Sequence, residues 1–202
     1  MNAFGLAAIP FNRLVRSRIH RAARYLLALL LLLLVEVAVA EIPSVGSKAP
    51  DFTLATPTGH SVRLSTQHSG SSLVVVVLRG FPGYQCPYCQ RQVHDFIEHA
   101  AEFAAKKASV LLVYPGPPAD LGKRANEFLA TQSKLPSNVV LVIDPDYKVT
   151  NLCGLRWDAP HETAYPSTFI LDRNGTIEFE KISHSHGDRL SAQDALDHLT
   201  AH

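Results

Sequence analysis

The chain has 202 residues, 47% of them apolar and 18% charged, with a formal net charge of +1. This composition is typical of a globular protein. The charge is uneven, because residues 1–40 carry five arginines and one acid, a formal +4, which leaves −3 for the remainder. A mildly acidic body argues against nucleic acid as a partner, since phosphate binding needs a basic face.

The first 40 residues have the order of a secretory signal peptide. A basic stretch ends at Arg24, ten apolar residues follow at 26–35, and Ala38-Val39-Ala40 puts small residues where an exporting peptidase reads. We therefore expect cleavage after residue 40.

The alternative is a membrane anchor that stays attached to the protein. A membrane span needs about 20 apolar residues, and Glu36 interrupts the run. Cleavage is therefore the preferred interpretation. In either case we expect the folded part, residues 44–202, to face a periplasmic or other extracytoplasmic compartment.

The first half of this folded part begins with strands and continues into a helix. Two short alternating runs, 52–54 and 62–64, flank Thr58-Gly59 and predict a β-hairpin. The run Leu-Val-Val-Val-Val-Leu at 73–78 predicts a strand buried on both faces. From Pro87 to about residue 106, apolar residues recur at helical spacing.

The second half alternates further strands and helices. Strands are predicted at 110–114, 139–143, 168–171 and 177–182, and helices from 120, over 146–153 and from 191. Asn174-Gly175 predicts a turn with positive φ at both residues. The order indicates one α/β domain in which helix-linked strands pair in parallel and the hairpins add antiparallel strands.

Cys86 and Cys89 lie where the buried strand has ended and the helix begins. Pro87 suits the first helical position, which places Cys86 at or beside the N-cap. The exposed N–H groups and the helix dipole favour a negative sulfur there, and a thiolate is the reactive form of cysteine. We expect Cys86 to attack and Cys89, one turn further on, to resolve.

Other interpretations of the cysteines have less support. Structural zinc needs two more ligands, for which only Cys153 and the pair His184 and His186 are available. We therefore predict no metal and no cofactor. A purely structural disulfide would close too short a loop to stabilise the fold much. Cys153 is interpreted as a buried apolar residue, with a role as a third redox cysteine left open.

A second signature is the segment Tyr-Pro-Ser-Thr-Phe-Ile-Leu-Asp at 165–172. A proline that directly precedes a strand does not donate to the sheet. If its peptide bond were cis, Pro166 would bring a backbone edge against the cysteine pair, and we expect this arrangement over an ordinary trans proline.

These segments together, with residues 45–54 and Arg79-Gly80, resemble the alkyl hydroperoxide reductase / thiol-specific antioxidant family of the thioredoxin fold. The resemblance implies a central mixed sheet flanked by helices. It also implies a Pro-x-x-x-Thr-x-x-Cys loop around the peroxidatic cysteine. Pro82 to Cys89 has that spacing, which would make Cys89 peroxidatic and put Cys86 in the place of the threonine.

Two features of that family are missing. The threonine hydroxyl is absent, and Pro166 stands about where the family has an arginine. Both departures are what similarity to thioredoxins would give. Arg79 or Arg91 could replace the arginine electrostatically. Tyr84 and Trp157 are candidates for lining the approach to Cys86, although Trp157 could equally be packing.

Three functions therefore remain open. The first is an exported thiol-disulfide oxidoreductase, whose partners would be protein disulfides or dithiols. The second is a peroxiredoxin-type thiol peroxidase acting on hydroperoxides as an antioxidant. The third is a metal-handling module using Cys86, Cys89 and a histidine. The first is slightly preferred on the sequence alone.

Overall fold

The computed structural model describes residues 40–199, so the predicted signal peptide lies outside the described residues except for Ala40. Within 40–199, no helix has the length and apolar character needed to cross a membrane. The elements in chain order are β1 (Thr53–Ala55), β2 (Ser61–Arg63), α2 (Leu64–Gln67), β3 (Ser72–Val77), α3 (Pro87–Glu98), α4 (Ala100–Ala105), β4 (Ala108–Gly116), α5 (Leu121–Leu129), β5 (Val139–Pro145), α6 (Lys148–Leu152), β6 (Ser167–Leu171), β7 (Ile177–Ile182) and α7 (Ala192–His198).

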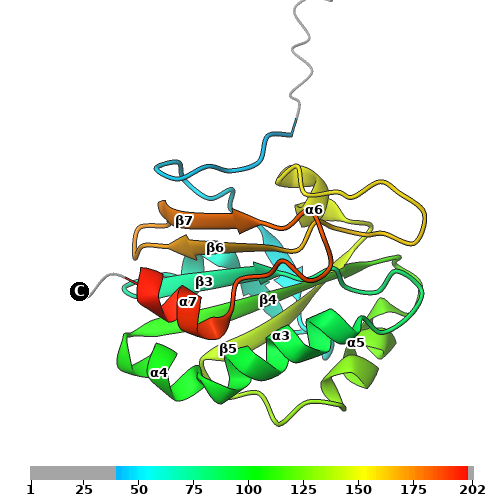
Figure 1. Cartoon of the computed structure of the whole chain (residues 1–202), viewed down its shortest axis with the longest axis horizontal. Coiled ribbons are helices and arrows are strands. Elements are labelled where there is room, and N and C mark those ends of the chain that lie inside the picture. The colour runs from blue at the N-terminus through cyan, green and yellow to red at the C-terminus, as the bar shows by residue number, and fades with distance from the viewer. Residues whose placement is uncertain (1–39, 200–202) are drawn as a thin grey trace, which may run out of the picture. The chain divides into compact units, whose positions relative to one another are not determined.

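The described strands form one mixed sheet in the order β2-β1-β5-β4-β3-β6-β7 (Figure 1). The helix-linked strands β3, β4 and β5 pair in parallel, and β6 and β7 add an antiparallel hairpin beside β3. The predicted N-terminal hairpin is β1 with β2, paired in antiparallel fashion. The predicted α/β architecture with a mixed sheet is confirmed.

The sheet separates two apolar clusters. On one face, α3, α4, α5 and α7 pack against the sheet and bury side chains such as Phe96, Phe103 and Phe128. On the other face, α2 and α6 cover a second cluster that includes Leu64 and Val149. Every residue of β3 is buried, because its alternate side chains enter the two clusters. This explains why its sequence is an unbroken apolar run.

The long helix predicted from Pro87 is divided in two at His99. The backbone of His99 departs from helical geometry, and the ring nitrogen Nδ1 of His99 lies 2.9 Å from the carbonyl oxygen of Asp95. The chain then continues as α4, whose Phe103 stacks on Phe96 of α3 with ring centroids 5.5 Å apart. The apolar periodicity continues through the break because both helices pack on the same face of the sheet.

The turn between β6 and β7 differs from the prediction at one residue. Gly175 has a positive φ of 79°, but Asn174 does not. The Asp172 carboxylate accepts hydrogen bonds from the backbone N–H groups of Asn174 and Thr176. This local bonding stabilises a turn that needs only one glycine-like residue, and the strand register shifts at Leu171 beside it.

The expected cis bond before Pro166 is wrong, because every peptide bond within residues 40–199 is trans. Tyr165 donates its N–H to Leu155, and the carbonyl of Pro166 accepts from Ser183. These two bonds hold the chain extended as it enters β6. Pro166 is therefore an ordinary trans proline in front of a strand, where its missing N–H removes no sheet hydrogen bond.

Candidate active site

Cys86 is the N-cap residue of α3. Its backbone is extended (φ −77°, ψ 114°), and its sulfur accepts a hydrogen bond of 3.4 Å from the N–H of Cys89. Pro87 follows at the first position of the helix. The sulfur therefore lies where unpaired N–H groups and the helix dipole favour negative charge, as the sequence predicts.

The two sulfurs have opposite electrostatic surroundings. A hydrogen bond from the Cys89 side chain, a second from the Cys89 N–H, the charge of Arg189 and a hydrogen bond from Arg79 together overcome burial and lower the pKa of Cys86 to about 5. Burial, followed by the hydrogen bond to Cys86, raises the pKa of the Cys89 thiol well above its usual value. At neutral pH the pair thus holds one thiolate, on Cys86, and one thiol.

Arg189 is the cation in direct contact with this thiolate. Its Nη2 lies 3.9 Å from the Cys86 sulfur. Its Nη1 donates to Gln92 on α3, and its Nε donates to the carbonyl oxygen of His186. The guanidinium is therefore held on three sides in the connection between β7 and α7.

Arg79 also lowers the pKa of Cys86, through a side-chain hydrogen bond, whereas Arg91 is not among the groups that lower it. The Arg79 side chain is only 2% exposed and pairs with Glu162 through an Nε–Oε2 distance of 2.5 Å. Its other nitrogens donate to the Tyr84 hydroxyl and the His161 carbonyl. Arg91 instead is exposed and lies over the ring of Tyr88 at 4.5 Å.

Glu162 connects the two arginine-bearing segments. One carboxylate oxygen holds Arg79, and the other lies 2.9 Å from Nε2 of His186. The Arg79 hydrogen bond, together with His186, lowers the pKa of Glu162 against the effect of burial. Because the His186 carbonyl also holds Arg189, one network joins both cations that stabilise Cys86.

The loop that carries Glu162 is itself held by one side chain. Arg156 donates to the carbonyl oxygens of Trp157, Glu162 and Thr163. Its backbone pairs with Ala164 across the base of the loop. The loop can therefore present Glu162 at a fixed position.

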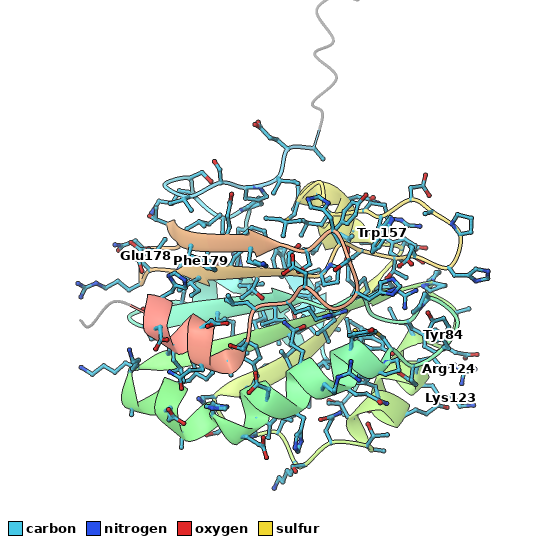
Figure 2. The ribbon with its side chains drawn as sticks, viewed as in Figure 1. Tyr84, Lys123, Arg124, Trp157, Glu178 and Phe179 are labelled. Atoms are coloured by element: carbon cyan, nitrogen blue, oxygen red, sulfur yellow. The ribbon has the colours of Figure 1, made fainter. Side chains whose placement is uncertain are left out.

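Aromatic rings surround this network. Trp157 stacks on Tyr165 with ring centroids 4.9 Å apart and lies 5.4 Å from the ring of His186. Tyr84 is 47% exposed and touches the network through Arg79. Figure 2 shows Trp157 and Tyr84 toward the same end of the domain. Trp157 packs on rings of the network, and Tyr84 forms part of its exposed edge.

Cys153 lies in different surroundings from those of Cys86 and Cys89. It belongs to the apolar cluster on the other face of the sheet and lines a small apolar cavity of about 30 Å³. Burial raises the pKa of its thiol to about 11. His184, the other unassigned candidate, packs against the ring of Tyr165. Within residues 40–199, no group of three or more His, Cys, Asp or Glu side chains is arranged to hold a metal.

Comparison with known proteins agrees with the fold. The sequence profile of the AhpC/TSA family matches residues 45–180, about two thirds of the chain. The chain belongs to the AhpC/TSA family. It is an oxidoreductase that works through cysteine thiols.

Individual relatives support the same assignment. Over 139 residues the chain is 32% identical to a Helicobacter pylori protein named as a peroxiredoxin, bcp, covering 66% of this chain and 84% of the relative. It is 28% identical to alkyl hydroperoxide reductase E of Mycobacterium tuberculosis over 160 residues, covering 78% and 99% of the two chains.

Two solved structures are similar as well. The peroxidoxin BcpB of Mycobacterium tuberculosis superimposes with a TM-score of 0.60 at 24% identity, covering 78% of this chain and 96% of the other, which shows the shared fold. A Chlorobium tepidum protein named as a thiol:disulfide interchange protein of the DsbE type has a TM-score of 0.56 at 26% identity, with coverage of 78% and 99%.

The sequence alone did not indicate Arg189 or Glu162. Arg189 lies 103 residues after Cys86, and Glu162 lies 83 residues after Arg79, in loops without a motif of their own. The available signal was indirect. A buried arginine such as Arg79 needs a carboxylate, and residues 156–163 hold the acids nearest to the second signature.

Proposed function

We propose that the protein is a thiol peroxidase in which Cys86 attacks the hydroperoxide and Cys89 resolves the product. The observation that supports this assignment is the Cys86 sulfur at the N-cap of α3, 3.9 Å from the guanidinium of Arg189, with its pKa lowered to about 5. The names of its relatives, peroxiredoxin and alkyl hydroperoxide reductase, support the same reaction class.

The chemistry has two steps on the enzyme. The Cys86 thiolate attacks the outer oxygen of the hydroperoxide, an S–O bond forms, the O–O bond breaks, and the leaving alkoxide or hydroxide takes a proton to become an alcohol or water. The Cys89 thiol then attacks the sulfenic acid, forms the Cys86–Cys89 disulfide and releases water. The arginines stabilise the negative charge that moves from sulfur to the leaving oxygen.

This assignment gives the peroxidatic role to a different cysteine from the one that the family pattern indicates. The Pro-x-x-x-Thr-x-x-Cys pattern would make Cys89 peroxidatic. The Cys89 side chain is fully buried, and its thiol pKa is raised. A neutral, enclosed thiol is a poor nucleophile, whereas it is suited to condense with a sulfenic acid on its neighbour. We therefore assign the peroxidatic role to Cys86.

The burial of the Cys86 sulfur favours a small hydroperoxide over a protein disulfide as the substrate. Cys86 is only 1% exposed. A small hydroperoxide can reach such an atom with little rearrangement, but a disulfide on a folded protein needs the sulfur at the surface. Thiol-disulfide exchange nevertheless remains the second candidate, because the Chlorobium tepidum interchange protein is similar at 26% identity and a C-x-x-C pair suits both reactions.

The test is rapid mixing of the reduced protein with hydrogen peroxide, followed by the fluorescence of Trp157, the one tryptophan in the chain. We expect Cys89→Ser to react once and to be labelled at Cys86 by dimedone, which traps sulfenic acids. Cys86→Ser should lose the reaction. A fast reaction in Cys86→Ser would instead assign the role to Cys89. Oxidation no faster than that of a free thiolate, with fast exchange against a disulfide, would favour the second candidate.

We also propose that the protein works outside the cytoplasm. The basic, apolar and small-residue order of residues 1–40 supports export. Cell fractionation with N-terminal sequencing of the product should find a chain that begins at Glu41, and a full-length chain in the cytoplasm would contradict the proposal.

A further inference from the structure

A groove of about 260 Å³ lies between α3 and the connection from β7 to α7. One wall is the α3 face that carries Tyr88, Arg91 and Gln92, and the other wall is formed by Gly187, Arg189, Leu190 and Ser191. The peroxidase chemistry proposed above uses Arg189 from this lining but assigns no ligand to the groove.

One side chain of the groove lining contacts the reactive sulfur. Arg189 and Gln92 both line it, and they are joined by a hydrogen bond of 2.9 Å. The same Arg189 guanidinium lies 3.9 Å from the Cys86 sulfur. A small molecule in the groove is therefore one side chain away from Cys86.

The available charge in the groove is positive. Asp95 is the acid in its lining, and its carboxylate is already bonded to the N–H of Ala192 and paired with His99. Arg91 contacts the ring of Tyr88, and no ion pair with an acid is found for it in residues 40–199. An anion that enters the groove would meet a cation without a carboxylate partner.

The burial of both cysteines limits what can regenerate them. In the dithiol state Cys86 and Cys89 are 1% and 0% exposed, so a thiol that reduces their disulfide must reach a buried pair. This favours a small thiol over the surface dithiol of a folded protein. Charge complementarity with Arg91 then favours a small thiol that carries a carboxylate.

We propose that this groove binds a small carboxylate-bearing thiol, the reductant of the Cys86–Cys89 disulfide, with Arg91 as the ion-pair partner of its carboxylate. The inference deepens the proposed function and rests on it for the origin of the disulfide. The donor thiolate attacks the Cys86 sulfur, an intermolecular disulfide forms, and Cys89 leaves and takes a proton. A second donor thiolate then attacks the sulfur of the bound donor, so that one donor disulfide and the Cys86 thiolate are released.

The test starts from protein oxidised with diamide, which makes it independent of any peroxidase activity. Mass spectrometry first checks that Cys86 and Cys89 are joined, and failure to join them overturns the inference. Reduction rates are then measured with glutathione, an anionic thiol, and with 2-mercaptoethanol, a neutral one. The ratio of the two rates reports recognition of charge.

We expect Arg91→Gln to lower this ratio about three- to fivefold, in line with an exposed ion pair worth up to about 1 kcal/mol. Arg91→Lys should restore much of it, and 0.5 M salt should lower it in the unmodified protein. Lys134→Gln removes the same charge at an exposed site outside the groove and should leave the ratio unchanged. An unchanged ratio in Arg91→Gln, or an equal fall in Lys134→Gln, would overturn the inference.

Discussion

Replacing Arg189 with methionine should make Cys86 a weaker acid by a calculable amount. Unit charges 3.9 Å apart, the distance from Arg189 Nη2 to the sulfur, interact by about 1 kcal/mol in water-like surroundings and about 4 kcal/mol at an effective dielectric constant near 20. Arg189 is half-buried, so we take about 2 kcal/mol. This corresponds to a rise of about 1.5 pH units in the Cys86 pKa.

The thiolate absorbance at 240 nm, measured against pH, checks this value directly. The lowest transition belongs to Cys86, because the Cys89 pKa is raised and that of Cys153 is about 11. With the Cys86 pKa moved from about 5 to about 6.5, the thiolate fraction at pH 5.5 falls from about three quarters to about one tenth, and it barely changes at pH 8. The rate of alkylation by a bimane reagent should follow the same curve.

Two further variants separate charge from packing. Arg189→Lys should keep most of the low pKa, because it keeps the positive charge. Arg63→Met removes an exposed arginine that pairs with Asp51 and does not contribute to the Cys86 pKa. It should leave the titration unchanged. If Arg189→Met titrates within about 0.3 pH units of the unmodified protein, at most about a fifth of the expected energy is present and the electrostatic argument for Cys86 is wrong.

Three other changes test the surroundings of the site. Glu162→Ala leaves the buried Arg79 without its carboxylate and should lower the free energy of unfolding by about 3 to 5 kcal/mol in urea titrations. Glu162→Gln keeps a hydrogen-bond acceptor but removes the same charge, so it should lose nearly as much; a clearly smaller loss would contradict a charge effect. Gly80→Ala places a Cβ atom within van der Waals overlap of the Pro115 carbonyl at a φ of 72° and should destabilise the fold by more than about 3 kcal/mol, while Gly59→Ala, with φ 91° and open space, should cost about 1 to 2 kcal/mol in the same assay. Cys153→Ala should leave the rate of oxidation by peroxide unchanged below pH 9, because the Cys153 pKa of about 11 keeps it a thiol; a slower reaction would reveal a redox role for it.

The sequence predicted the parts of the fold that depend on local periodicity. The apolar run of β3 indicated a strand covered on both faces, and Pro87 after Cys86 indicated a helix start with sulfur at the N-cap. The break at His99 was not predictable from periodicity, because the apolar face continues across it into α4.

The long-range parts of the site could not be predicted in the same way. Arg189 approaches Cys86 only because β7 pairs beside β6 and the chain then crosses back to α7. The cis bond at Pro166 was wrongly expected, since the bonds of Tyr165 and Pro166 to Leu155 and Ser183 depend on segments distant in sequence.

The stabilised thiolate also has a consequence for the redox equilibrium of the cysteine pair. The hydrogen bonds and cations around Cys86 act on a negative sulfur, and that charge disappears once the sulfur is bonded to Cys89. The surroundings therefore favour the reduced state selectively. Each 1.4 kcal/mol of this preference raises the two-electron reduction potential by about 30 mV. The same contacts that speed attack on a peroxide thus make the disulfide an oxidising one, which even weakly reducing thiols can reopen.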